Sequence, residues 1–240
     1  MNLSLMDQFL WVIFPYITLT IFVLGHIYRY NTDQIGWSAK SSEIMEKRLL
    51  RWGSPLFHYG IIFAFFGHVA GVLIPKWMYE LLMVPDELYH FGAVYIGGLV
   101  GVLALVGLVI LIIRRMTVSR VRLFTERVDW ITIIVLFLVV FQGVYVTVIR
   151  NFLVGEFDYR STIGPWFRSL FTFSPNPELM VTVPLSFQIH VLLAFLLFAM
   201  WPFTRLVHLW SLPLEYLKRR YISYRSLNFL RSFKLSKNKQ

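Results

Sequence analysis

Cysteine is absent from this sequence of 240 residues, and charged residues are scarce. Without cysteine the chain can form no disulfide, no thiolate zinc site and no iron–sulfur cluster of its own, so any redox centre must be bound through His, Met or Tyr. Charged residues make up only 15% of the chain, against 57% hydrophobic residues and a mean hydropathy of +0.63. A soluble domain of this length needs far more polar surface. The composition therefore indicates an integral membrane protein.

Acidic residues are also few, and the formal net charge is +10. The basic residues fall in short clusters between apolar runs, which is the distribution of membrane topology signals rather than of a nucleic-acid surface. Nucleic acid is therefore excluded as a partner. The basic tail, about 208–240, is expected to contact anionic membrane lipid or a cytoplasmic partner.

Five apolar stretches are each long enough to cross a hydrocarbon core of about 30 Å, which takes about 20 helical residues. They cover residues 9–27, 55–74, 91–113, 128–149 and 185–207. No Lys or Arg precedes Arg29 and no cleavage signal follows the first stretch, so it is not expected to be a signal peptide. The sequence predicts an all-α integral membrane protein, a bundle of five transmembrane helices in a single domain of residues 1–240.

The connections between these stretches predict the orientation of the bundle. Of the 23 Lys and Arg residues, 19 lie in alternate segments that would share one side, and four lie in the others. Because basic residues are retained in the cytoplasm, the N-terminus is expected outside and the C-terminus inside. The longest connection, about 150–184, is predicted to cap the outer face, with a short surface helix around Trp166–Phe171.

Four of the six histidines lie in or at the ends of two spans: His58 and His68 in the second, His190 and His208 in the fifth. Ionisable residues in a bilayer are costly enough to indicate function. Imidazole is the usual axial ligand of a low-spin haem, and a cytochrome with two haems needs four such ligands on two facing helices. Haem ligation is therefore favoured over hydrogen-bonded helix contacts or a proton path.

Antiparallel spans would pair His68 with His190 around an outer haem and His58 with His208 around an inner one. One difficulty is the spacing of the histidines along each span. The ten residues from His58 to His68 rise about 15 Å as a helix, whereas the eighteen from His190 to His208 rise about 27 Å, so tilt or kinking must absorb a difference of about 12 Å. On the second span, Gly60, Gly67 and Gly71 share one side, which leaves room either for a macrocycle or for close helix packing.

Other polar residues near the spans have weaker assignments. His26 lies at the inner end of the first span, where solvent contact satisfies an imidazole. His90, at the outer start of the third span, is a candidate contact for a quinol head group. Arg114, Arg115 and Arg205 are expected at the inner face, where they could pair with haem propionates or simply mark topology.

Three stretches of this chain resemble the gamma subunit of respiratory nitrate reductase, the cytochrome b membrane anchor. They are FHYGIIFAFFGHVAGVLIPKWMYE (Phe57–Glu80), RRMTVSRVR (Arg114–Arg122) and SFQIHVLLAFLLFAMWPFTRLVHLWSLPLEYL (Ser186–Leu217). The resemblance covers nearly the whole chain and includes the two histidine spacings and the W-S-x-P-x-E-Y-L ending.

This resemblance implies two b haems bound by His58, His68, His190 and His208, in the pairing given above. It also implies oxidation of quinol, menaquinol or ubiquinol, beside the outer haem, where Gly67 and His68 would line the site. Other members can carry a lysine near the start of the third span, where this chain reads ELYHFGA with His90. Electrons would leave to a cytoplasmic iron–sulfur beta subunit and then to a molybdenum-containing alpha subunit, so those cofactors belong only to partners.

Three other functions fit the same residues. The chain could anchor a formate dehydrogenase, a hydrogenase or a sulfur-metabolising reductase, which only the partner distinguishes. A transporter or proton channel with histidine relays would be colourless when purified. For a purely structural anchor, replacing His68 or His190 would leave quinol oxidation unchanged.

Overall fold

The computed structural model describes residues 3–34, 36–38 and 42–211. The chain divides into a compact unit, Met1–His208, and a second unit, Leu209–Gln240. The predicted basic tail lies outside the described residues except for its first four.

Five helical segments in the first unit are long and apolar enough to cross a membrane: Leu5–Thr32, Arg48–Leu73, Asp86–Thr117, Arg127–Val154 and Leu185–Phe203. They confirm the five spans expected from the sequence. Large apolar side chains such as Phe63, Phe65 and Phe66 are about 60% exposed on the second segment, which suits contact with lipid tails. The protein is an all-helical, multi-pass membrane protein.

Each of the first four segments combines α-helix with a π-helical turn. The first contains α1 (Leu5–Gln8), the π turn η1 (Phe9–Ile13) and α2 (Phe14–Thr32), and the second contains α3 (Arg48–His68) and η2 (Val69–Leu73). The third contains α5 (Asp86–Phe91), η3 (Gly92–Ile96) and α6 (Gly97–Thr117), and the fourth contains α8 (Arg127–Val144), η4 (Tyr145–Ile149) and α9 (Arg150–Val154). Pro15, the second residue of α2, lacks a backbone N–H and so cannot bond back into the preceding turn, which accounts for η1.

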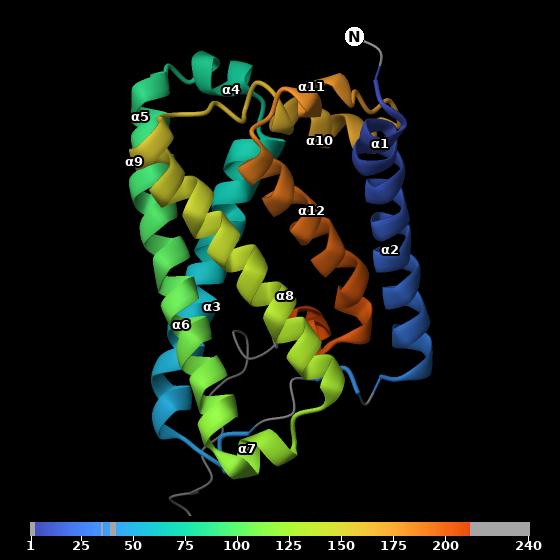
Figure 1. The fold of residues 1–240 in the computed structure, drawn as a ribbon, viewed down its shortest axis with the longest axis vertical. Coiled ribbons are helices and arrows are strands. Elements are labelled where there is room, and N and C mark those ends of the chain that lie inside the picture. Colours follow the sequence, from blue (N-terminus) through green and yellow to red (C-terminus); the bar gives the residue numbers. More distant parts are fainter. Residues whose placement is uncertain (1–2, 35, 39–41, 212–240) are drawn as a thin grey trace, which may run out of the picture. The chain divides into compact units, whose positions relative to one another are not determined.

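The two ends of the helical unit differ in their connections (Figure 1). One end carries α4 (Lys76–Leu81), α10 (Ile163–Phe171) and α11 (Glu178–Val181), and the other carries α7 (Ser119–Leu123). We call these the α10 end and the α7 end. The short helix expected near Trp166–Phe171 is confirmed as α10, and it is anchored by the fully buried Trp166, whose indole N–H donates to the Trp11 carbonyl at 2.9 Å.

Glycine brings α3 and α6 into close contact. A Cβ added at Gly60 would meet the backbone of Ala104, and one added at Gly107 would meet the backbone of Phe57. Such glycines let two helices approach within a membrane, where packing drives association. The small-residue contact of the second span is therefore at Gly60, whereas Gly67 faces open space.

The fifth span ends earlier than the sequence predicts. α12 (Leu185–Met200) passes into a 3-10 turn, η5 (Trp201–Phe203), then an extended Thr204, and then a second 3-10 segment, η6 (Arg205–Ser211). Pro202 ends the α-helix, because it has no N–H and its ring would clash with the preceding turn. Residues 204–207, expected within the fifth span, instead follow its end at Phe203.

The packing of α3 on α6 can be tested with Gly107→Ala. The new methyl group would collide with the α3 backbone, and overpacking of this kind costs about 1 to 3 kcal/mol, so the thermal unfolding temperature in detergent should fall. Gly92→Ala is the matched control, because its added methyl group meets nothing within 4 Å. Equal unfolding temperatures for both variants would contradict the close approach of α3 and α6.

Candidate functional site

The structure brings the four histidines together as two pairs. The rings of His68 and His190 lie 6.0 Å apart, centre to centre, with 26° between their planes. The rings of His58 and His208 lie 6.0 Å apart with 71° between their planes. The first pair lies towards the α10 end and the second towards the α7 end, which is the pairing that antiparallel spans predict.

The early end of α12 removes the spacing difficulty. From His190 to Met200 the helix rises about 15 Å, the same as from His58 to His68. The remaining residues to His208 form the turn at Pro202 and Thr204 instead of continuing the rise. His208 therefore reaches the level of His58 without the strong tilt that a straight helix would need.

Backbone carbonyls orient three of the four imidazoles. The Nδ1 atoms of His58, His68 and His208 lie 2.7, 2.7 and 2.6 Å from the carbonyl oxygens of Ser54, Ala64 and Arg205. A ring that donates through Nδ1 to a carbonyl keeps Nε2 deprotonated and free to bind a metal. This hydrogen bond also fixes the orientation of the ring.

His190 differs from the other three. Its Nδ1 is buried and makes no hydrogen bond of ordinary length, although the ring lies beside the backbone of Val139 on α8. A Cβ added at Gly143, also on α8, would lie 3.1 Å from the Cε1 atom of His190. The absence of a side chain at Gly143 therefore leaves space for this ring.

The separation within each pair suits one metal ion between two imidazoles. Imidazole nitrogen binds metals at about 2 Å, and two such bonds plus the distance from each nitrogen to its ring centre make up about 6 Å. Two imidazoles on opposite faces of one iron are the axial ligands of a low-spin haem. The donor set at both pairs fits a haem.

A cavity of about 650 Å³ contains the α10-end pair. His68 and His190 line it, and three of the π turns contribute to its wall. Gly67 and Gly92 line it without filling it, since a Cβ at either would meet nothing within 4 Å. The space beside the histidines is lined mostly by apolar side chains, as sites for large organic ligands are.

The α10 end of the cavity is rimmed by polar groups. His90 lines it, and its Nε2 lies 2.9 Å from Oε1 of the exposed Glu156. The hydroxyl oxygens of Tyr89 and Tyr159 lie 3.0 Å apart. Burial raises the pKa of Tyr159, so its phenol stays protonated and available as a donor.

An ion network holds this rim in place. Arg160 donates to Asp86 and Asp158 at 3.0 and 3.1 Å, and its guanidinium lies 3.9 Å from the ring centre of Tyr89. Burial opposes the charge of Arg160, but these two carboxylates outweigh burial and raise the pKa of Arg160. Lys76 joins the network 2.8 Å from Asp86, and this hydrogen bond raises the pKa of Lys76.

Sequence reasoning identified His90 at the rim but missed the two tyrosines and Arg160. Tyr159 and Arg160 come from the long connection after the fourth span, whose path over the cavity has no pattern in the sequence. The only available signal was the Leu-Tyr-His run, which places Tyr89 next to His90. His26 lies away from both pairs, with its Nδ1 2.6 Å from the Phe22 carbonyl oxygen.

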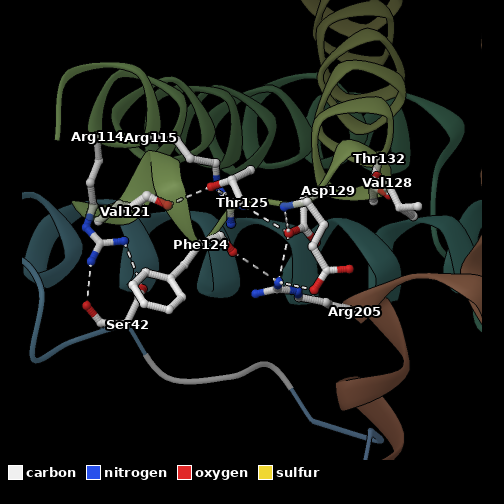
Figure 2. A network of polar contacts seen from close by, with 11 residues as sticks. Ser42, Arg114, Arg115, Val121, Phe124, Thr125, Val128, Asp129, Thr132 and Arg205 are labelled. Carbon is white, nitrogen blue, oxygen red and sulfur yellow. Dashed lines mark hydrogen bonds and ion pairs between the residues drawn. The ribbon is translucent and has the colours of Figure 1, made fainter. Parts of the chain in front are cut away.

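The arginines expected near haem propionates have protein partners. All three guanidinium nitrogens of the buried Arg114 donate to Ser42 or Glu46. Figure 2 shows Arg205 and Arg115 converging on the carboxylate of Asp129, at 2.8 and 3.7 Å. These contacts give no support to a propionate role, which stays a prediction for Arg114 and Arg205.

The sequence is similar over almost its whole length to known nitrate reductase gamma chains. The nitrate reductase gamma chain of Bacillus subtilis is 48% identical over 218 residues, 91% of this chain and 97% of that protein. The respiratory nitrate reductase 2 gamma chain of Escherichia coli is 37% identical, covering 92% of this chain and 97% of its own length.

A longer relative contains the same region as one part. The nitrate reductase-like protein NarX of Mycobacterium tuberculosis is 41% identical over 224 residues, 93% of this chain but 34% of that protein. The family model for the nitrate reductase gamma subunit matches residues 7–227. With five membrane helices and two facing histidine pairs already in place, this match settles the relationship: the chain belongs to the nitrate reductase gamma subunit family.

Proposed function

We propose that this chain is the cytochrome b subunit of a respiratory nitrate reductase, which oxidises quinol and passes the electrons through two b haems to partner subunits. The observation that carries the proposal is that two histidine pairs form at two levels of α3, each with 6.0 Å between ring centres, one with α12 and one with η6. Family membership supports the assignment to nitrate reductase over formate dehydrogenase, hydrogenase or sulfur reductase anchors.

His68 with His190, and His58 with His208, would hold the two haems. When bound, each haem carries one electron at a time across part of the membrane. The residues of this chain set the ring orientations through the backbone carbonyls described above. The glycines that line the cavity leave room beside His68, and its apolar wall excludes water from that haem.

The same cavity would admit the quinol, menaquinol or ubiquinol. Its apolar part suits the substrate ring and tail, and its polar rim suits the hydroxyl groups. His90 would hydrogen-bond one quinol hydroxyl, and its partner Glu156 is 71% exposed, so a proton leaving through this pair would reach water. Gly67 would leave space for the head group.

The α10 end would face outside and the α7 end the cytoplasm, because clusters of Lys and Arg flank the spans at the α7 end. Protons would be released outside while electrons travel inwards to an iron–sulfur beta subunit, and from there to the molybdenum-containing alpha subunit that reduces nitrate. Moving one charge through 100 mV is worth about 2.3 kcal/mol. The chain would thereby couple quinol oxidation to the membrane potential.

Haem binding is tested by an optical spectrum with haem counted per chain. The purified wild-type chain should contain two b haems. His68→Ala should lose one of them and His58→Ala the other, because each substitution leaves one intact pair, and His26→Ala is the control that should keep both. A colourless wild-type protein would overturn the cytochrome proposal and favour a histidine-relay transporter.

The quinol contact is tested with His90→Gln. The quinol hydroxyl becomes charged as its proton leaves, so losing its hydrogen bond to His90 should slow haem reduction by a quinol analogue about 10- to 100-fold. Both haem spectra should stay unchanged. His26→Gln, at the other end of a span, should reduce at the wild-type rate. A wild-type rate for His90→Gln would place the quinol elsewhere in the cavity.

A further inference from the structure

Three of the four histidines lie on regular helix, but His208 does not. It follows the break at Pro202 and Thr204, in a 3-10 segment where helical hydrogen bonding is weaker. Its ring is oriented by the carbonyl of Arg205, three residues earlier. The position of this ring therefore depends on what holds the turn between α12 and His208.

Arg29 of α2 holds the first part of this turn. Its Nη1 donates to the carbonyl oxygens of Pro202 and Thr204, both at 2.7 Å, although these residues are more than 170 positions away in the sequence. Its Nη2 donates to the Gly36 carbonyl at 2.9 Å, and its side chain is 18% exposed. One guanidinium therefore fixes the two carbonyls on either side of Phe203.

Asp129 of α8 holds the second part. Its carboxylate lies 2.8 Å from Nη2 of Arg205, the residue whose carbonyl orients His208 (Figure 2). The side chain of Asp129 is only 8% exposed, and it also accepts from the backbone N–H of Glu126 at 3.0 Å. Glu126 and the Phe124 carbonyl lie 3.5 Å from the same guanidinium nitrogen.

The two contacts come from the two helices on which α12 packs, α2 and α8. We propose that Arg29 and Asp129 are positioning residues for the α7-end haem, which hold the His208 turn so that its imidazole faces His58. The inference rests on the proposed function, since it presumes that His58 and His208 ligate a haem. Neither residue lies beside the α10-end pair, so their influence is specific to one haem.

These contacts matter because a turn without them would not hold the His208 ring in one orientation. A continuous helix would fix the ring of its histidine through unbroken backbone hydrogen bonds, whereas this segment is interrupted at the extended Thr204, whose Oγ1 accepts from the Leu206 N–H and donates to the Trp201 carbonyl. Outer-shell residues that orient a metal ligand typically change metal affinity about 10- to 100-fold when replaced. A charged group at low exposure is well suited to this role, because its hydrogen bonds are strong.

The test uses the full-length chain expressed with its partner subunits. Asp129→Asn keeps the side-chain shape and the oxygen that accepts from the Glu126 N–H, but it removes the negative charge that binds Arg205. Arg29→Gln removes the guanidinium that donates to the Pro202 and Thr204 carbonyls. The controls are Glu43→Gln, an exposed carboxylate that pairs with Lys47, and the exposed Arg127→Gln. Haem content, the midpoint potential of each haem and its electron paramagnetic resonance signal are measured, because that signal responds to the angle between the axial imidazole planes.

We expect both variants to lose the α7-end haem about 10 to 100 times more readily than wild type, or to shift its potential and resonance signal, while the α10-end haem is unchanged. His58→Ala and His68→Ala identify which signal belongs to which haem. The retained α10-end haem also shows that the variant has folded. Equal shifts of two retained haems, or wild-type signals for both, would overturn the inference.

If either variant loses both haems, Arg29→Lys is measured as well. Its ammonium group keeps the positive charge but cannot reproduce the guanidinium hydrogen bonds to the Pro202 and Thr204 carbonyls. A selective change of the α7-end haem then supports the inference, and any other result overturns it. The proposed function fails separately, since it fails only if the wild-type chain binds no haem.

Discussion

Everything in this structure depends on bringing two imidazoles to the same depth on oppositely directed segments. In the proposed function each pair binds one metal ion between its rings, so an error of a few ångströms in the rise of either segment would separate the rings. Carbonyls four residues earlier orient the two rings on α3. The glycine contact between α3 and α6 fixes the position of α3. The chain from α12 to η6 must then bring His190 and His208 to the levels of His68 and His58.

The two histidine sites are built differently. At the α10 end both histidines lie on α-helix, and the cavity beside them is lined by π turns and by glycines that leave space. At the α7 end His208 lies in a 3-10 segment, and charged side chains of α2 and α8 bind the residues that precede it. One pair therefore lies beside open space, and the other is tied into a polar network.

Much of this could be predicted from the sequence, because a bilayer restricts the possible folds so strongly. The five spans and the pairing of His68 with His190 follow from hydropathy and direction alone. The fifth span was expected to end at residue 207 but ends at Phe203, since hydropathy continues past Pro202 and only the spacing of His190 and His208 indicated that tilt or kinking was needed. The partners of Arg114 and the placement of Tyr159 could not be predicted, because both depend on connections whose path is set by tertiary packing.

The break at Pro202 separates His190 from His208. His190 lies on α12, whereas His208 lies in a 3-10 segment that charged groups of α2 and α8 hold in place. Under the proposed function, a change at the α7 end would reach the haem of His58 and His208 through that segment and leave the other haem undisturbed. The chain would then respond to events at one end of the bundle without altering the chemistry at the opposite end.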